Sequence, residues 1–293
     1  MRVFAHDLYT YPLPPGHRFP FAKYRLARER AEHEPAVELG EARAVSGLEL
    51  ELGHSCEYVA RVEAGDLSRQ EERALGLPWS PALVERAKRS VGATLEAART
   101  ALADGVAANL GGGTHHAFPD SGRGFCVFND VVVATRALQR EGRLRRLLVV
   151  DLDVHQGDGT HASFAGEPAA FTFSVNGFSN YPFRRVPADL ELDLPDRTSD
   201  DRYLAELERL LPVAIARARP DISFYLAGAD PYEGDRLGRL ALTKPGLRAR
   251  DRMVRDVLAA AGVPVCVTLA GGYAEPIENT VDINLATLSV FAG

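Results

Sequence analysis

The chain has only three cysteines in 293 residues, Cys56, Cys126 and Cys266, and they form no paired motif. An odd number of scattered cysteines argues against a secreted domain held by disulfides and favours a reducing compartment. The opening sequence MRVFAHDLYT lacks the basic and then apolar pattern of a signal peptide, and no run of about 18 apolar residues could span a bilayer. We therefore expect a cytoplasmic protein with no membrane partner.

An excess of positive charge is also missing, because 34 lysines and arginines face 40 aspartates and glutamates, for a net charge of −6. A nucleic-acid-binding chain needs a basic face, so we expect no direct binding of nucleic acid. The arginine clusters at 28–30 and 143–146 are assigned to solvated surface. No linker rich in Gly, Ser or Pro divides the chain, so residues 1–293 are predicted to form one domain.

Short β-rich runs alternate with amphipathic helical patterns. The runs lie at 2–7, 145–155, 169–175, 222–230 and 264–272, and several are almost wholly apolar, as strands covered on both faces should be. Helices are predicted over 80–102, with Ser80 as N-cap, after Ser199-Asp200-Asp201, and over 246–261; Pro212 weakens the prediction for the second half of the middle one. This alternation predicts an α/β fold with a mainly parallel central sheet and helices on both faces.

Polar residues follow the predicted strands at the point where parallel sheets place their chemistry. On an extended backbone, Asp151, Asp153 and His155 share one face. Burying two carboxylates is costly unless a cation or many hydrogen bonds compensate, so we predict a bound metal. Asp153 and His155 supply two ligands, and Asp230, at the end of another apolar run, is the best third. Three protein ligands would leave a coordination position for water.

Two glycine turns also follow apolar runs. The first, at 111–116, ends in His115 and His116, and neutral imidazoles are the usual general bases near pH 7. A phosphate-binding loop is the alternative, but the GK[ST] ending and the dinucleotide spacing are both missing. The second turn, at 269–273, ends in Tyr273, which could donate a hydrogen bond to a developing oxyanion or could be a packing residue.

Taken together, these motifs resemble the histone deacetylase family over most of the chain. The resemblance rests on LPPGHRFPFAKY at 13–24, GGGTHHA at 111–117, GFCVFND at 124–130, DLDVHQGDGT at 151–160, AGADPYEGDRLG at 227–238 and LAGGYA at 269–274. The EGDRLG ending and the stretch LELDLPDRTSDDRYL look most like the class IV branch and its bacterial relatives. The resemblance implies a single-domain arginase/deacetylase fold.

It also implies a zinc-dependent deacylase that hydrolyses an acyl-lysine amide, with Zn²⁺ held by the predicted ligand trio and activating a water. Asp151 would polarise His115 and Asp158 would polarise His116. His116 would take the proton of the water and later protonate the departing amine, while His115 would act electrostatically. Tyr273 would stabilise the tetrahedral oxyanion. From the residues alone, the donor set of one imidazole and two carboxylates also suits Fe²⁺, Co²⁺ or Mn²⁺.

Two further features come from the same resemblance. A structural monovalent cation, usually K⁺, would be held by the side chains of Asp151 and Ser174 and by backbone carbonyls around Asp153, His155 and Val175. The predicted substrate channel consists of Phe125, Gly124, Tyr181, Leu237, Gly271 and Gly272. Its second aromatic wall falls within 177–183, where Tyr181, Phe178 and Phe183 are all candidates. Cys126 would lie beside the site.

The substrate is predicted to be an acyl-lysine peptide or protein, or a small acylated amine. Leu237 stands where polyamine-specific relatives carry a glutamate, which favours acyl-lysine over acetylpolyamine. A ureohydrolase with two Mn²⁺ is a rival, but Asp230 is followed by Pro231-Tyr232-Glu233 and not by a second aspartate at two-residue spacing. A non-catalytic acyl-lysine binding module would be expected to have lost His115, His116 and Tyr273, which are present.

Overall fold

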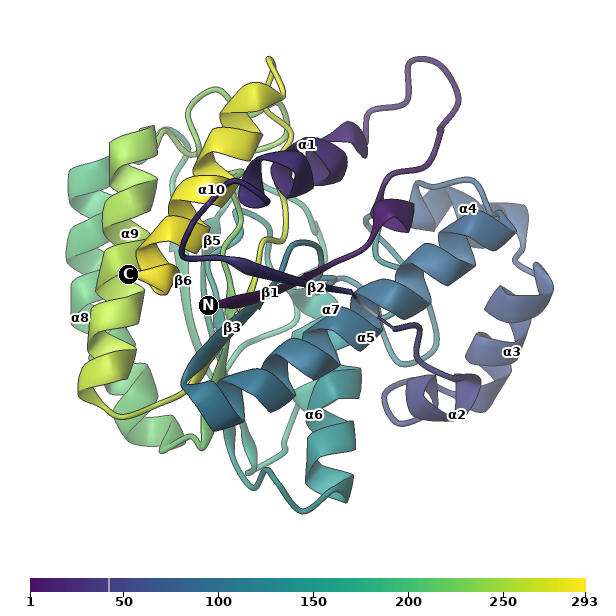
Figure 1. The fold of residues 1–293 in the computed structure, drawn as a ribbon, viewed down its shortest axis with the longest axis horizontal. Helices are drawn as coiled ribbons and strands as arrows, with labels where there is room; N and C mark the ends of the chain where they lie inside the picture. The colour runs from purple at the N-terminus through teal and green to yellow at the C-terminus, as the bar shows by residue number, and fades with distance from the viewer. Residues whose placement is uncertain (42) are drawn as a thin grey trace.

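Eight parallel strands form one sheet in the computed structural model, which describes residues 1–41 and 43–293 (Figure 1). Within these residues the strand order is β2-β1-β3-β8-β7-β4-β5-β6. The strands are β1 (Arg2–Ala5), β2 (Glu38–Glu41), β3 (Val106–Asn109), β4 (Leu147–Asp151), β5 (Ala170–Gly177), β6 (Leu190–Leu194), β7 (Ile222–Leu226) and β8 (Val265–Thr268). The predicted α/β fold with a parallel sheet is confirmed.

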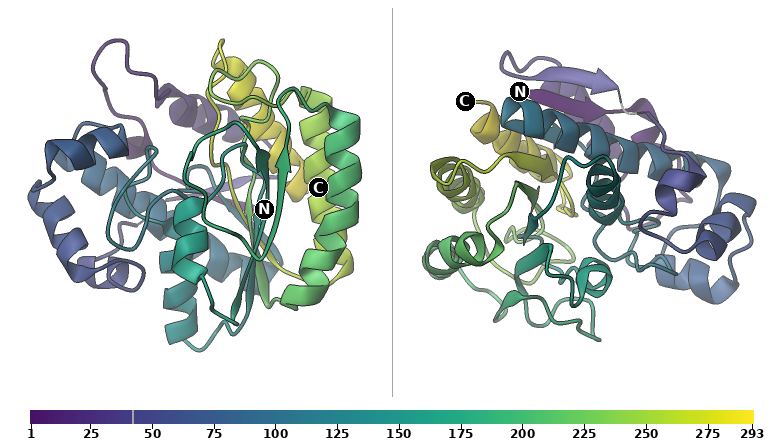
Figure 2. Two further views of the ribbon diagram at one scale, coloured as in Figure 1. Left: turned by 180° about the vertical axis from the view of Figure 1, so that it is seen from behind. Right: turned by 90° about the horizontal axis from the view of Figure 1, so that it is seen from below.

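Helices cover both faces of the sheet, as Figures 1 and 2 show. The long α5 and α6 pack together on one face, and α8, α9, α10 and α1 pack on the other. The helices are η1 (Asp7–Tyr9), α1 (Ala22–Ala31), α2 (Gly47–Leu50), α3 (Cys56–Ala64), α4 (Arg69–Leu75), α5 (Pro81–Asp104), α6 (Asp130–Arg140), α7 (Asp158–Phe164), α8 (Asp200–Ala218), α9 (Lys244–Ala260) and α10 (Glu278–Ala292). Among the helices so described, none combines the length and apolarity needed to cross a bilayer.

Strand β4 illustrates why the predicted strands are apolar on both sides. Successive side chains of a strand point to opposite faces of the sheet. Leu147 and Val149 join the apolar cluster under α5 and α6, whereas Leu148 and Val150 join the cluster under α8 and α9. All four side chains are fully buried, so burial on both faces accounts for the unbroken apolar run.

The predicted helices are present with small differences at their ends. Ser80 caps α5 by accepting a hydrogen bond from the amide of Leu83, as expected. The helix predicted over 246–261 is α9. In α8 the helix continues through Pro212 to Ala218. Pro212 lies on the exposed side, while Leu211 and Ala214 remain buried beside it, so apolar burial along α8 outweighs the lost hydrogen bond.

Four of the predicted strands were too long, because β1, β4, β7 and β8 end at Ala5, Asp151, Leu226 and Thr268. The run 145–155 was expected to be extended throughout, but β4 ends at Asp151. Two carboxylates, one at that point and one just after it, bond to nearby backbone: Asp151 Oδ1 accepts the amide of Asp153 at 3.2 Å, and Asp153 Oδ1 accepts the amide of His155 at 3.0 Å. Such local bonds favour turns over continued strand pairing. They end the regular strand at Asp151, although the amide of Leu152 still donates to the carbonyl of Leu226 at 3.1 Å.

A buried histidine connects the loops that lie between α2 and α6. The ring of His54 donates from Nδ1 to the carbonyl of Phe118 at 3.0 Å and accepts at Nε2 from the amide of Asn129 at 2.9 Å. Both bonds require the neutral ring. Burial lowers the pKa of His54 to about 4, although the nearby carbonyls oppose this shift.

We expect this histidine to make the protein acid-sensitive. Because its pKa is lower in the folded state, protons bind preferentially to the unfolded chain once the pH falls below ~6.5. The free energy of unfolding should then drop by about 1.4 kcal/mol per pH unit until the pH approaches ~4. Urea unfolding of His54→Gln between these pH values should show a flatter pH dependence than the wild type. The exposed His33→Gln serves as control, and equal slopes for His54→Gln and wild type would contradict this assignment.

Candidate metal and catalytic site

The loops that follow four neighbouring strands converge at the carboxyl edge of the sheet. Strands β3, β8, β7 and β4 are adjacent and parallel, so their carboxyl ends lie side by side. The loop after β3 carries the two histidines, the loop after β8 carries Tyr273, the loop after β7 carries Asp230, and the segment after β4 carries Asp153 and His155. The sheet therefore brings together residues that are more than 150 positions apart in the sequence.

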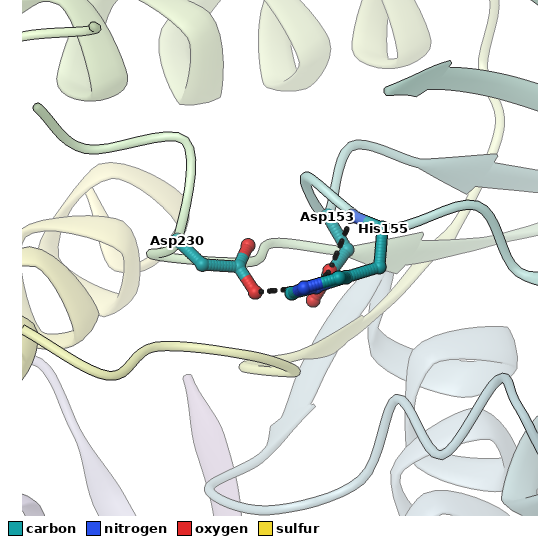
Figure 3. Close-up of side chains that lie close together, drawn as sticks. All are labelled: Asp153, His155 and Asp230. Atoms are coloured by element: carbon teal, nitrogen blue, oxygen red, sulfur yellow. Dashed lines mark hydrogen bonds and ion pairs between the residues drawn. The ribbon is translucent and has the colours of Figure 1, made fainter. Parts of the chain in front are cut away.

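Asp153, His155 and Asp230 form a compact cluster with potential metal-ligand atoms within 4.8 Å of one another (Figure 3). The ring of His155 lies between the two carboxylates. Its Nδ1 is 2.9 Å from Asp153 Oδ1 and 3.2 Å from Asp230 Oδ2. Both carboxylates are buried. Ligands that bind one Zn²⁺ at about 2.0–2.2 Å lie within ~4.4 Å of one another, so small side-chain adjustments would suffice to hold an ion.

The electrostatics of this cluster fit a cation. Asp230 Oδ2 is buried, and its only polar contact among the described residues is the ion pair with His155 Nδ1. Burial, and then the charge of Asp153, raises the pKa of Asp230 to about 7. Burial would lower the pKa of His155, but its contacts with both carboxylates outweigh that effect and raise it to about 10. A protonated imidazole thus supplies the positive charge that a metal bound to the same three residues would provide.

His115 and His116 are each paired with a buried carboxylate, as the resemblance implied. His115 Nδ1 lies 2.7 Å from Asp151 Oδ2, and His116 Nδ1 lies 2.6 Å from Asp158 Oδ1. The two ring centroids are 4.1 Å apart, and the His116 ring is 6.0 Å from that of His155. Each carboxylate fixes the orientation of its ring and leaves Nε2 available.

The two histidines have pKa values shifted in opposite directions. Burial would lower the pKa of His115, but Asp151 and Asp153 outweigh it and raise the pKa to about 9. For His116, burial and then the neighbouring His115 lower the pKa to about 4, despite the bond to Asp158. His115 therefore favours the charged form and His116 the neutral form, the division needed for an electrostatic partner beside a general base.

Tyr273 is positioned by two residues that the sequence analysis did not single out. Lys23, which is buried, donates from Nζ to the carbonyls of Ala270 and Gly272 at 3.2 and 3.3 Å, and lies 5.3 Å from the Tyr273 ring centroid. Asp235 accepts the amide of Tyr273 at 2.6 Å. Burial, followed by the charges of Asp230 and Asp153, raises the pKa of Tyr273, so its phenol stays protonated. In the sequence, Lys23 resembles an ordinary exposed lysine of a helix. Only the tertiary contacts show that it is buried against the Tyr273 loop.

The glycine turn before the histidines depends on another residue that was quoted only as part of a family motif. Asp130, at the start of α6, accepts the amides of Gly113 and Thr114 at 3.0 and 2.8 Å and the hydroxyl of Thr114 at 2.5 Å. Gly113 has a φ of 69°, and an added Cβ would lie 2.6 Å from the Cβ of Ala270. Asp130 thus fixes the turn that orients both histidines.

Gly271 approaches the metal-ligand cluster so closely that no side chain would fit. Its amide donates to Asp153 Oδ2 at 2.8 Å, and an added Cβ would overlap Asp230 Oδ2 and lie 2.5 Å from Asp153 Oδ2. Gly272 packs against Thr280 and Ala229. Neither of these two predicted channel residues is among those that line the large cavity, and Gly271 instead borders the metal-ligand cluster.

Replacing Gly271 with alanine should therefore weaken metal binding. The methyl group must displace one or both carboxylates, and we expect Zn²⁺ affinity to fall by about tenfold or more, as for other residues that orient metal ligands. Competition with a chromogenic chelator measures this directly. Gly47→Ala is the matched control, because an added Cβ there meets only the side chain of Glu63 at 3.4 Å. Unchanged affinity in Gly271→Ala would show that the close approach has no bearing on the ion.

A cavity of about 920 Å³ leads from the surface to His116, His155 and Tyr273. Gly124, Phe125, Tyr181 and Leu237, four of the predicted channel residues, line it. Phe125 has a φ of 68°, a left-handed conformation that is unusual for an aromatic residue and is typical of functional sites. Its backbone is held in place because its amide donates to the carbonyl of Leu75, at the end of α4, at 2.8 Å.

The three candidates for the second channel aromatic differ in position. The Tyr181 ring lies 4.8 Å from that of His116, at the inner part of the cavity. Phe183 also lines the cavity but is 88% exposed, and Phe178 is 67% exposed and outside the lining. Tyr181 is therefore the candidate that faces the histidine pair.

Of the residues predicted to hold the structural cation, Asp153 and His155 belong to the metal-ligand cluster, and the other three lie on strands β4 and β5. Asp151 and Ser174 are partners in neighbouring strands β4 and β5, and both side chains are buried, as is Val175. Among the described residues, no amide donates to the carbonyls of Asp153 and His155. The cysteines are all free; Cys126 is buried beside Gly124, and Cys56 is exposed.

Comparisons with known proteins agree with this geometry. A family model described as the histone deacetylase domain matches residues 17–288. An uncharacterized protein from Picosynechococcus is 42% identical over 282 residues, which cover 95% of this chain and 94% of that protein. The human polyamine deacetylase HDAC10 is 32% identical over 89% of this chain and 42% of its own length. The crystal structure of the HDA15 HD domain has the same fold, with a TM-score of 0.83 at 21% identity over 100% of this chain and 91% of that one. The chain therefore belongs to the histone deacetylase family and is a hydrolase of amide bonds.

Proposed function

We propose that this protein is a zinc-dependent deacylase that hydrolyses the amide of an acylated lysine. One observation carries the proposal. Two histidines are each bonded to a buried carboxylate, and their pKa values are shifted in opposite directions. They lie beside the three potential metal ligands, at the inner end of a cavity with aromatic walls. A protein that only binds acyl-lysine does not need a neutral, oriented general base at this position.

The residues divide the chemistry among them. Zn²⁺ bound by the ligand trio supplies Lewis acidity to the attacking water and to the acyl carbonyl. His116, neutral at working pH, accepts the proton of the water at Nε2 and returns it to the departing amine. His115, whose pKa the carboxylates of Asp151 and Asp153 raise despite its burial, would stabilise the negative charge that develops nearby. Tyr273 donates its phenolic proton in a hydrogen bond to the oxygen of the tetrahedral intermediate.

The proposal includes a structural K⁺ beside the ligand cluster. Asp151 would contribute a carboxylate and Ser174 a hydroxyl, and the carbonyls of Asp153, His155 and Val175 would complete an all-oxygen site. What supports it is the burial of both side chains and the lack of amide donors to the carbonyls of Asp153 and His155 in the described chain. Oxygen donors of this kind suit hard cations.

Acylated lysine is favoured over an acetylated polyamine because of Leu237. One relative is a polyamine deacetylase, so an acetylated polyamine is the alternative substrate to compare. Leu237 lines the cavity, and its apolar side chain offers no negative charge to the second amine of a polyamine. An acyl-lysine substrate needs no such charge at this point.

A panel of substrates tests the proposal. Purified protein loaded with Zn²⁺ is assayed with acetyl-lysine and long-chain acyl-lysine amides, with acetylspermidine, and with His116→Ala as a control for contaminating activity. We expect hydrolysis of one or more acyl-lysine amides and none by the variant. Turnover of acetylspermidine alone would replace lysine by a polyamine as the substrate. Two bound Mn²⁺ with release of urea from a guanidinium substrate would reject the deacylase altogether.

A further inference from the structure

The mouth of the cavity is basic although the protein as a whole is acidic. Four arginines line it: Arg18, Arg73, Arg236 and Arg239. In the described part of the chain, no aspartate or glutamate is among the twenty lining residues. The net charge of the protein is −6, so this concentration of positive charge is local. Charges of one sign around an opening attract ligands of the opposite sign.

The arginines come from three segments, all of which line the same cavity. Arg73 lies in the last turn of α4, whose final carbonyls accept the amides of Gly124 and Phe125 at 3.1 and 2.8 Å. The position of Arg73 is therefore tied to the channel wall. Arg18 lies in the loop before α1 and lines the same mouth.

The third segment carries Arg236 and Arg239 on either side of Leu237. Asp235 Oδ1 accepts the amides of Leu237 and Gly238 at 2.8 and 2.9 Å. The carbonyl of Leu237 also accepts a bond from Asn180 Nδ2 at 2.8 Å. This loop is thus a defined part of the channel rim, and its arginines are held near the path of the substrate.

These guanidinium groups are available to a ligand. Arg18 and Arg73 form no ion pair with the described residues, and both are exposed. Arg236 pairs with Glu275 at 3.2 Å and Arg239 with Asp196 at 3.4 Å, but all four of these side chains are at least 40% exposed. Exposed ion pairs of this kind contribute only about 0–1 kcal/mol, so a substrate carboxylate can replace either partner.

We propose that the preferred substrate is an acyl-lysine in an acidic peptide segment, with aspartate or glutamate on both sides of the lysine. This inference rests on the proposed deacylase function and names its substrate class. The acyl-lysine enters the channel while neighbouring carboxylates bind the arginines of the three segments. Arginine forms two parallel hydrogen bonds with a carboxylate, so the contact depends on orientation as well as on charge. A basic segment, or a polyamine, meets repulsion at the same place.

The test compares three acetyl-lysine peptides that differ only in their flanking residues, which are glutamate, glutamine or lysine. We expect kcat/KM to be about tenfold or more higher for the glutamate peptide than for the lysine peptide at low salt, with the difference shrinking at ~0.15 M salt. In Arg18→Gln/Arg73→Gln the ratio between the two peptides should fall severalfold. Arg145→Gln, which removes an exposed arginine just before the amino end of β4, is the matched control and should keep the wild-type ratio.

The outcomes separate this inference from the function on which it rests. Equal hydrolysis of all three peptides, or a preference that the double variant keeps in full, would overturn the acidic-substrate inference and leave the deacylase intact. No hydrolysis of any peptide would count against the deacylase. In that case, fluorescence anisotropy can measure how tightly the same peptides bind to the zinc-loaded Tyr273→Phe protein. This measurement still tests whether the cavity mouth prefers acidic peptides. Tighter binding of the glutamate peptide supports the inference, and equal affinities overturn it.

Discussion

Replacing Asp230 with asparagine should abolish both zinc binding and hydrolysis. Asparagine keeps the shape of the side chain and can still accept the amide of Val154, as Asp230 Oδ1 does at 3.0 Å. It removes the charge at Oδ2, the buried atom that is paired with His155 Nδ1 in the described chain. A bound cation contributes several kcal/mol to catalysis of this type. Because each 1.4 kcal/mol is about tenfold in rate, we expect kcat/KM to fall about a thousandfold or more.

Stability gives a second, independent result for this variant. In the metal-free protein, burial and the charge of Asp153 disfavour an ionised Asp230, so the neutral asparagine should be tolerated or slightly stabilising. Zinc should raise the melting temperature of the wild type and leave that of the variant unchanged, because only a native-state ligand stabilises by mass action. Asp158→Asn is the control: it disturbs the His116 pair, so activity should fall while zinc content stays near that of the wild type. Full zinc occupancy in Asp230→Asn would remove Asp230 from the ligand set.

Tyr273→Phe should lower kcat by about a hundredfold or more and leave KM and zinc content little changed. The ring packs against Phe19 and Phe125, at centroid distances of 6.0 and 6.1 Å, and phenylalanine preserves these contacts. Only the hydroxyl is lost, and removal of a single oxyanion donor typically costs this much in rate. An effect confined to kcat is expected, since the hydrogen bond strengthens only as charge develops on the oxygen.

A matched control for the loss of a hydroxyl is available in the same protein. Tyr11→Phe removes a buried hydroxyl that has no partner in the described residues and does not line the substrate cavity. It should behave as the wild type in kcat and in stability. If Tyr273→Phe raised KM and left kcat unchanged, the phenol would be a substrate-binding group and not an oxyanion donor.

Local pattern was sufficient for most of the fold. The apolar runs that became β4, β5, β7 and β8 are recognisable because these central strands are buried on both faces. The edge strands β2 and β6 were not anticipated. They are partly exposed and carry the polar sequences ELGE and LELDL, so they have no continuous apolar run. Edge position is a property of the whole sheet and leaves little trace in a short segment.

The same division holds within the site. The ligand trio could be proposed from sequence because each member ends an apolar run, and parallel strands bring such ends together. The partners of His115 and His116 could be named only by resemblance, since nothing in the residues alone pointed to a role for Asp158. Lys23 and Asp235 position the Tyr273 loop through backbone groups, and contacts of that kind have no sequence pattern.

What the sequence determined by itself was the order of apolar and polar residues, and with it the strands, the helices and the strand-end chemistry. The tertiary structure decided which distant side chains share a surface. The arginines of the mouth stand at 18, 73, 236 and 239, too far apart to register as a cluster, whereas the arginine runs at 28–30 and 143–146 were visible and received no function. Charge acts through space and not along the chain, so the electrostatic character of the mouth emerges only when the fold brings its segments together.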